Sequence, residues 1–121
     1  MKIFLVGPMG SGKSKIGKLL SSEINLNLID IDKEIEAKFE KTIVEIFASE
    51  GEESFRDKEI NFLEKITASE DVVVSTGGGI IEASVNRDIL EKEENVIFLN
   101  ASVESQFQAT KDKTKRPLLN N

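Results

Sequence analysis

The sequence predicts an α/β fold in which a parallel β-sheet lies between two layers of helices. Four short, β-branched apolar runs alternate with helical patterns. The runs are continuously apolar, which is typical of strands buried on both faces. The length of 121 residues allows one domain at most, spanning residues 1–121. The four runs cover residues 3–6, 26–31, 72–75 and 96–99.

Helical patterns occupy the segments between these runs. After the first run, apolar residues recur at the i, i+3, i+4 and i+8 spacing of one helix face. Thr42 followed by Glu45 predicts a capping box at the start of another helix, and residues 55–66 form a longer amphipathic segment. Ser84 and Ser102 are predicted N-caps of two further helices. The apolar face of the first helix consists of Ile16, Leu19, Leu20 and Ile24.

The composition argues against several classes of protein. The formal net charge of −6 and the pI of about 4.8 disfavour a nucleic-acid partner. The chain contains no cysteine and no histidine, so disulfides and the usual zinc ligands are excluded, and catalysis falls to Asp, Glu, Lys and Arg. No segment approaches the roughly 20 apolar residues that a membrane span needs. We expect a monomeric, cytoplasmic protein without a membrane partner.

The segment Gly7–Ser14 matches G-x-x-x-x-G-K-[ST], the phosphate-binding P-loop pattern, between a predicted strand and a predicted helix. Glycines let backbone N–H groups surround a phosphate, and the helix that begins near Ser14 adds the positive end of its dipole. Lys13 is expected to reach the β- and γ-phosphates of ATP, and the Ser14 hydroxyl to bind Mg²⁺. A glycine-rich turn with an incidental lysine is the alternative. A dinucleotide-binding fingerprint fits less well, because Lys15 stands at the position of its third glycine.

Two carboxylates follow the second apolar run. The third run is followed by no acidic residue, although many P-loop proteins carry a magnesium-binding aspartate there. The i, i+2 spacing of Asp30 and Asp32 places both side chains on one side of an extended chain. One is expected to bind Mg²⁺ through water, and the other to accept the proton of a substrate hydroxyl. The alternative is that one or both only cap a helix that starts near Lys33.

Three glycines follow the third run, and one arginine stands in the long helical segment. Gly77, Gly78 and Gly79 would let backbone N–H groups approach a polar ligand, although a flexible turn is the alternative. Arg56 is one of three arginines and can bind a carboxylate through two hydrogen bonds, although a solvated helix residue is the alternative. The P-loop, the aspartate pair and the glycines each follow a strand, so we expect them to meet in one crevice.

A basic cluster precedes the second proline of the chain. Its functional interpretation is a mobile lid over approximately residues 109–120 that carries positive charge to the transferred phosphoryl group. The alternative is a polar surface loop. The cluster consists of Lys111, Lys113, Lys115 and Arg116, followed by Pro117.

In combination, these motifs resemble the shikimate kinase family in their order and spacing, over nearly the whole chain. The resemblance implies a P-loop NTPase-type three-layer fold with a parallel sheet, of which four strands are present in this sequence. P-loops occur in many families, whereas the Asp-x-Asp, Phe-Arg and triple-glycine motifs together are typical of this one. The matching segments are Gly7–Ser14, Asp30–Asp32, Glu50–Arg56, Thr76–Gly79 and Lys115–Leu119.

The resemblance implies transfer of the γ-phosphoryl group of ATP to the 3-hydroxyl of shikimate, with Mg²⁺, to give shikimate 3-phosphate and ADP. It implies that Asp32 holds the reacting hydroxyl and that Arg56 pairs with the shikimate carboxylate. Catalytic roles then fall to Lys13, Asp32 and Arg116, the last from the lid. The implied nucleotide-binding residues are Gly10, Ser11, Gly12, Lys13, Ser14, Lys15 and Arg116, the shikimate-binding residues are Asp32, Arg56, Gly77, Gly78 and Gly79, and the metal-binding residues are Ser14 and Asp30.

The sequence departs from the family pattern in two places. Ala109 stands where an arginine usually lies near the adenine, which predicts weaker nucleotide binding. The sequence ends at Asn121, before roughly the last quarter of the family's domain, so a second substrate arginine, a fifth strand and a final helix are missing. We therefore expect an open sheet edge and reduced activity. The alternative functions are a gluconate or nucleoside monophosphate kinase, or an ATP-binding module without catalysis.

Overall fold

A computed structural model describes residues 1–8 and 10–100 of the chain. Strands and helices alternate along most of this length, and the four strands form one sheet in the order β2-β3-β1-β4, with every neighbouring pair parallel. The predicted α/β class is therefore confirmed. The elements are β1 (Lys2–Val6), α1 (Lys13–Ile24), β2 (Asn27–Asp30), α2 (Ile31–Phe39), α3 (Ile43–Glu50), α4 (Glu52–Ile66), β3 (Val72–Ser75), the 3₁₀ helix η1 (Ile80–Glu82), α5 (Ser84–Glu91) and β4 (Val96–Phe98).

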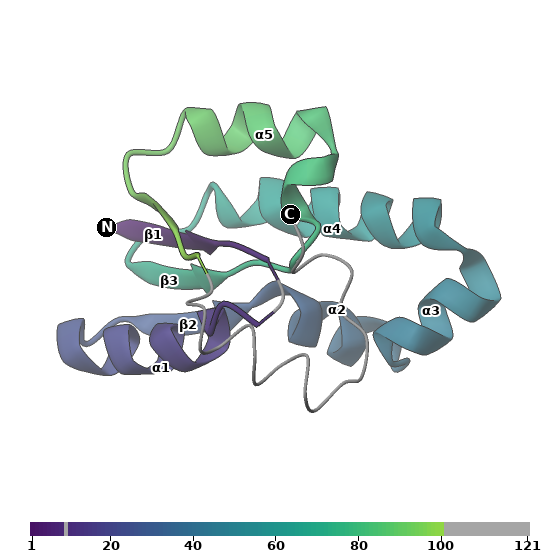
Figure 1. The fold of residues 1–121 in the computed structure, drawn as a ribbon, viewed down its shortest axis with the longest axis horizontal. Helices are drawn as coiled ribbons and strands as arrows, with labels where there is room; N and C mark the ends of the chain where they lie inside the picture. Colours follow the sequence, from purple (N-terminus) through teal and green to yellow (C-terminus); the bar gives the residue numbers. More distant parts are fainter. Residues whose placement is uncertain (9, 101–121) are drawn as a thin grey trace.

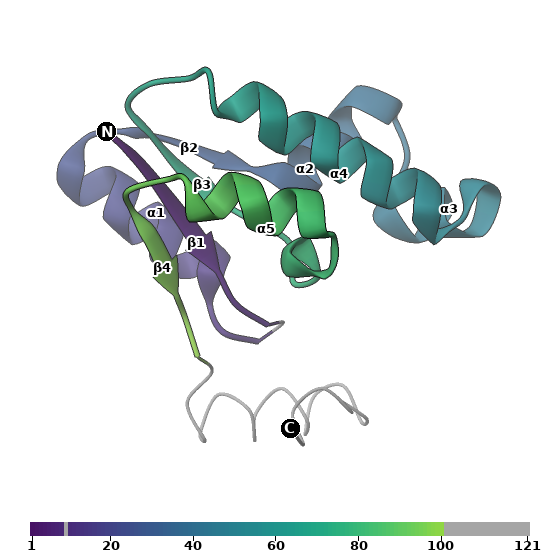
Figure 2. The ribbon, with the colours of Figure 1, turned by 90° about the horizontal axis from the view of Figure 1, so that it is seen from above.

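Helices cover both faces of the sheet, with α1 on one side and α4 and α5 on the other (Figures 1 and 2). Side chains alternate along a strand, so β1 contributes to two separate cores. Leu5 packs with Val73 toward α1, whereas Phe4 packs in the larger cluster with residues of α2, α3, α4 and α5. The three-layer arrangement predicted from the continuously apolar runs follows from this two-sided burial.

The residues of the two central strands, β1 and β3, are the most buried of the sheet. All four residues of β3 are buried, as are all residues of β1 after Lys2. The border strands β2 and β4 are only partly buried, and Phe98 is 64% exposed. Burial on both faces was thus predicted correctly for β1 and β3 and wrongly for β2 and β4, because a border strand of the described sheet is covered on fewer sides.

The predicted helix after the first strand is α1, but its apolar face meets the core only in part. Leu20 packs against the smaller core, whereas Leu19 is 60% exposed. The contact with the sheet centres instead on Gly17, where a β-carbon would lie 3.0 Å from Leu28 Cδ1. The helix therefore approaches the sheet through a residue without a side chain, and periodicity of apolar residues does not detect such a contact.

Two predicted caps have opposite outcomes. The capping box at α3 is confirmed: Thr42 Oγ1 accepts from Glu45 N at 3.1 Å, and Thr42 N donates to Glu45 Oε1 at 2.9 Å. Ser84 is not an N-cap, because it is the first helical residue of α5 and makes no capping hydrogen bond. Ala83 occupies the cap position, and side chains from within α5 hold the preceding turn instead. The predicted cap at Ser102 lies outside the described residues.

Candidate active site at the carboxyl ends of the strands

Two adjoining clefts lie at the carboxyl ends of β1, β2 and β3, as the parallel topology predicts. The first has a volume of about 620 Å³ and is lined by the P-loop, the two aspartates and the start of the glycine turn. The second has a volume of about 610 Å³ and contains Arg56. Both clefts include Asp32, Ile43, Gly77 and Gly78, so they form one continuous site with Asp32 at their boundary.

The P-loop takes its shape from glycines at three positions. Gly10 and Gly12 have φ angles of 82° and 85°, in the left-handed region that favours glycine. A β-carbon at Gly7 would lie 2.3 Å from the carbonyl oxygen of Leu99, so no larger residue fits there. Gly12 is the N-cap of α1 and has no side chain over the first N–H groups of the helix. These groups are therefore open to an anionic ligand.

Lys13 is the first residue of helix α1, and its side chain bonds to the loop that precedes the helix. Its Nζ donates to the carbonyl oxygen of Gly7 and, at 3.0 Å, to that of Pro8. Only 9% of the residue is exposed. Burial lowers the pKa of Lys13 below its usual value, and the negative charges of Asp32 and Asp30 offset part of that effect. The lysine is therefore held by neutral carbonyl groups that a phosphate can replace.

Asp30 lies between the P-loop and α2; its predicted role as a helix cap is confirmed, and its role toward Mg²⁺ stays a prediction. Its Oδ1 accepts from Lys33 N at 3.3 Å and so caps α2, while its Oδ2 accepts from Ser14 Oγ at 3.2 Å. A hydroxyl and a carboxylate are ligands that suit Mg²⁺. Among residues 1–8 and 10–100 there is no cluster of three or more acidic side chains able to hold a metal. Ser14 and Asp30 thus fit an ion that takes its other ligands from phosphates and water.

Asp32 lies in the first turn of α2, not in extended chain as its spacing from Asp30 suggested. The strand ends at Asp30, so the i, i+2 argument for a shared orientation was wrong. Asp32 Oδ1 is buried and has no hydrogen-bond partner among the described residues. Burial raises the pKa of Asp32, and so do the charges of Asp30 and Glu36, while Lys13 and Arg56 oppose the rise. An unpartnered carboxylate oxygen with a raised pKa suits a proton acceptor for a bound hydroxyl group.

Arg56 is not the solvated helix residue that the sequence left open, because only 21% of its side chain is exposed. Its Nη1 donates to Glu59 Oε1 at 3.0 Å, and its Nη2 lies 2.7 Å from Glu82 Oε2 and 3.4 Å from Glu52 Oε2. Partial burial alone would lower the pKa of Arg56, but the bond and charge of Glu59, with Glu82 and Glu52, raise it overall. The guanidinium therefore stays charged in the second cleft.

The sequence analysis missed the three glutamates around Arg56. Glu59 is fully buried, and its Oε2 has no partner among the described residues. Burial raises the pKa of Glu59, while its hydrogen bond and attraction to Arg56 act in the opposite direction. The i, i+3 and i, i+4 spacings from Arg56 were signals that could have identified Glu59 and Glu52 on α4. No local spacing indicates Glu82, because η1 brings it to Arg56 from another part of the chain.

The three glycines have separate roles in the walls of the site. A β-carbon at Gly77 would lie 2.8 Å from Asp32 Oδ1, and one at Gly79 would lie 2.6 Å from Arg56 Nη2. Gly78 is exposed and lines both clefts. The turn is also anchored, because Thr76 Oγ1 donates to the carbonyl oxygen of Leu5 at 2.7 Å. The glycines therefore let the backbone approach the two charged side chains closely, which a simple flexible turn does not require.

Some of the remaining predicted site residues line the first cleft, and the others lie outside the described residues. Gly10, Ser11, Gly12 and Lys15 line the first cleft with Lys13 and Ser14. Arg116, Ala109 and the predicted lid over residues 109–120 lie outside the described residues. Within the part of the chain that the structure describes, no helix is long and apolar enough to span a bilayer.

Another hollow of about 610 Å³ lies at the opposite ends of the strands. Lysine and acidic side chains line it, and Lys2 Nζ already pairs there with Glu93 Oε1 at 3.5 Å. Ligands of open parallel sheets bind at the carboxyl ends of the strands, where the glycine turns meet. The P-loop and Arg56 clefts are therefore the candidate active site.

Comparison with known proteins identifies the family to which this chain is similar. The family model described as shikimate kinase matches residues 9–121. The chain is 47% identical over 119 residues to a shikimate kinase of Histophilus somni (98% of this chain, 68% of the relative). It is 43% identical over 117 residues to that of Buchnera aphidicola (97% and 68%).

Solved structures give the same result. Shikimate kinase from Acinetobacter baumannii in complex with shikimate has a TM-score of 0.86 at 41% identity, covering 97% of this chain and 65% of that one. The enzyme from Aquifex aeolicus has a TM-score of 0.83 at 35% identity, covering 98% and 70%. The chain thus spans about two thirds of the length of the relatives it matches. On this match in sequence and structure, the chain belongs to the shikimate kinase family of phosphotransferases.

Proposed function

We propose that this chain transfers the γ-phosphoryl group of ATP to the 3-hydroxyl of shikimate, giving shikimate 3-phosphate and ADP. The observation that carries the proposal is the position of Asp32 at the boundary between two clefts, one with the P-loop and one with Arg56. A donor and an acceptor bound in these clefts would meet at its carboxylate. The match to a relative solved in complex with shikimate supports this choice of acceptor.

The P-loop half would hold ATP. Gly10 to Lys15 would surround the phosphates with backbone N–H groups, and Lys13 would exchange its bonds to the Gly7 and Pro8 carbonyls for phosphate oxygens. Mg²⁺, held by Ser14 and through water by Asp30, would offset negative charge that develops between the β- and γ-phosphates. Arg116 would add positive charge from the lid.

The Arg56 half would hold the acceptor. Arg56 would pair with the shikimate carboxylate, and the backbone of Gly77 to Gly79 would contact the ring hydroxyls. The 3-oxygen attacks the γ-phosphorus while the bond from that phosphorus to the β–γ bridging oxygen breaks, and its electron pair leaves with ADP. Asp32 orients the hydroxyl and receives its proton. Positioning and charge neutralisation account for most of the catalysis, and no covalent enzyme intermediate forms.

The proposal is tested by ADP release from the purified chain with ATP, Mg²⁺ and one acceptor at a time. Shikimate should be the preferred acceptor over gluconate and nucleoside monophosphates, and omission of Mg²⁺ should abolish turnover. Preference for gluconate or a monophosphate would replace the proposed acceptor. ATP binding in calorimetry without shikimate binding would favour a non-catalytic ATP-binding module.

We further propose that the chain acts as a monomer in the cytoplasm, with a small-molecule acceptor and without a nucleic-acid or membrane partner. The net charge of −6 supports the absence of a nucleic-acid partner. Sedimentation equilibrium at several protein concentrations tests the oligomeric state, and a mass twice that of the chain would contradict it.

A further inference from the structure

The Arg56 cleft has an unusual charge balance for a site that receives a carboxylate. Among the described residues that line it, Arg56 is the only cation. Four carboxyl side chains share the lining with it, so the local charge opposes an entering anion. The carboxyl groups belong to Asp32, Glu52, Glu59 and Glu82.

The three glutamates that contact Arg56 are not equivalent. The Glu59 side chain is 1% exposed, lies on the same helix and anchors one edge of the guanidinium. The Glu82 side chain is 62% exposed and binds the Nη2 atom at 2.7 Å, closer than Glu52 at 3.4 Å. Glu82 is therefore the contact that combines a short distance with access to solvent. A competing carboxylate can displace an exposed partner far more easily than a buried one.

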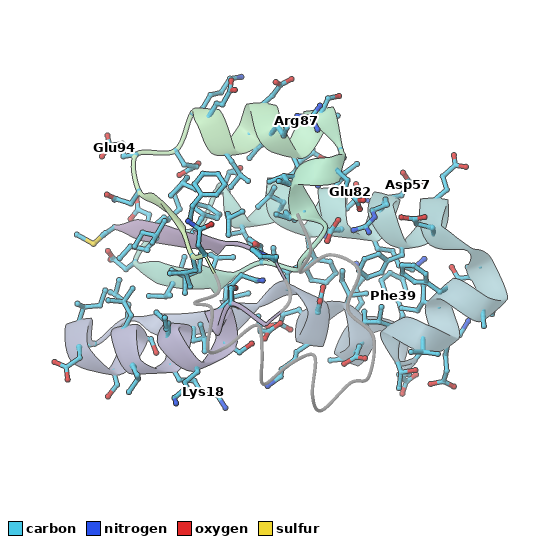
Figure 3. All side chains as sticks on the ribbon, viewed as in Figure 1. Lys18, Phe39, Asp57, Glu82, Arg87 and Glu94 are labelled. Carbon is cyan, nitrogen blue, oxygen red and sulfur yellow. The ribbon has the colours of Figure 1, made fainter. Side chains whose placement is uncertain are left out.

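The pair between Arg56 and Glu82 lies directly against the turn that follows β3. A β-carbon at Gly79 would be 2.6 Å from both Arg56 Nη2 and Glu82 Oε2. The carboxylate of Glu82 thus lies beside the glycine backbone of the cleft wall. Figure 3 shows Glu82 where this turn approaches α4.

The backbone of η1 is fixed independently of the Glu82 side chain. Arg87 Nη1 donates to the carbonyl oxygens of Ile81 at 2.6 Å and Glu82 at 3.2 Å. The fully buried Asn86 donates from Nδ2 to the carbonyl oxygen of Ile80 at 3.0 Å. The Glu82 side chain can therefore rotate into solvent without unfolding the turn that carries it.

We propose that Glu82 is an internal competitor for the substrate carboxylate: it occupies Arg56 when no acceptor is bound and must leave when the acceptor binds. This inference rests on the proposed function, because it assumes an acceptor with a carboxylate. Glu82 is then a residue that sets acceptor affinity without touching the transferred phosphoryl group. Its partly exposed ion pair limits the effect to about two- to fivefold in affinity.

The test compares Glu82→Gln with the wild-type chain and with Glu53→Gln. Glu53→Gln removes the same charge from the first turn of α4, where the side chain makes no ion pair with Arg56. Calorimetry should show shikimate binding about two- to fivefold tighter to Glu82→Gln, and the KM for shikimate should fall more than the KM for ATP. Glu53→Gln should bind shikimate with the wild-type affinity and should have the wild-type KM for shikimate. Shikimate methyl ester, which lacks the charge, should bind equally well to all three chains.

Unchanged or weaker shikimate binding by Glu82→Gln would overturn the inference. If Glu82 only positioned Arg56, its removal would lower the affinity for shikimate instead of raising it. Glu82→Asp provides a second variant, since it keeps the charge but withdraws it from Arg56, and it should also bind shikimate more tightly. If the wild type binds shikimate and Glu82→Gln does not bind it more tightly, the inference fails and the proposed function stands. A wild-type chain that binds ATP but not shikimate would remove the proposed function, and the inference with it.

Discussion

Lys13 lines the first cleft and Arg56 lines the second, and the two residues differ in what holds their side chains. Lys13 bonds to neutral carbonyl oxygens of its own loop, whereas Arg56 contacts three carboxylates from α4 and η1. A phosphate that binds Lys13 displaces dipoles, but a carboxylate that binds Arg56 competes with full negative charges. Occupancy of the Arg56 half should therefore depend more on salt and on neighbouring side chains than occupancy of the P-loop half.

Asp32 lies where the two halves meet, so its substitution should have the largest effect. Asp32→Asn removes the proposed proton acceptor, and kcat should fall on the order of 10³-fold. Because the pKa of Asp32 is raised, the wild type should lose activity with falling pH at a value above 3.8, as the carboxylate takes up a proton. The variant should lack this acid limb in a pH series of ADP-release rates. An unaltered pH profile with near wild-type kcat would contradict the role of Asp32.

The P-loop half is tested through its lysine. Lys13→Met should lower kcat/KM on the order of 10²-fold, because it removes a positioned positive charge from the transferred phosphoryl group. Lys18→Met on the exposed side of α1 is the matched control and should retain wild-type kinetics. Shikimate affinity in calorimetry should be similar for both variants. A large loss of shikimate affinity in Lys13→Met would show that the two halves are not separable.

The acceptor half is tested through Arg56. Arg56→Ala should raise the KM for shikimate about 10- to 150-fold, because a charge-assisted hydrogen bond contributes about 1.5–3 kcal/mol. The KM for ATP should change little, which is the reverse of the pattern expected for a P-loop variant. Arg87→Ala removes an arginine that binds only backbone carbonyl groups among the described residues. If it raises the KM for shikimate as much as Arg56→Ala does, the effect is not specific to Arg56.

The smallest expected effect concerns stability and the buried Glu59. Its pKa is raised by burial, so the native state holds this proton more tightly than the unfolded chain. Its contribution to stability is therefore complete below pH 4.5 and is lost as the pH rises through the raised pKa. Urea unfolding across this range should show a shallower decline for Glu59→Gln, which cannot titrate. Equal pH dependence in both chains would mean that Glu59 does not control it.

Local motifs made the P-loop half predictable. Gly10, Gly12, Lys13 and Ser14 belong to one contiguous segment between a strand and a helix, and the structure places this segment in one cleft. Gly10 and Gly12 have positive φ angles. A backbone position with positive φ favours glycine, so the residue type alone indicates it in a sequence. The capping box of α3 was correct for the same reason, since both of its bonds join residues three positions apart.

The Arg56 half was only partly predictable. The sequence indicated Arg56 and the glycine turn, but it gave no sign that Glu82 would pair with Arg56. It also placed Asp32 in extended chain, because the strand was expected to continue to residue 31, whereas α2 begins there. Boundaries between a strand and a helix depend on which residues the rest of the fold can cover. Apolar patterns alone therefore leave them uncertain by a few residues.

The sequence by itself determined the alternation of strands and helices, the P-loop and the candidate residues at three strand ends. These features depend on backbone geometry and on contacts between near neighbours in the chain. Only the tertiary structure decided that Asp32 separates two clefts and that Arg56 lies among three glutamates. The parallel crossovers bring α2, α4 and η1 together at the carboxyl ends of the strands. The packing of these elements determines which charged side chains contact one another. Contacts between segments that are distant in the sequence follow from the packing of the whole domain, so no local sequence pattern indicates them.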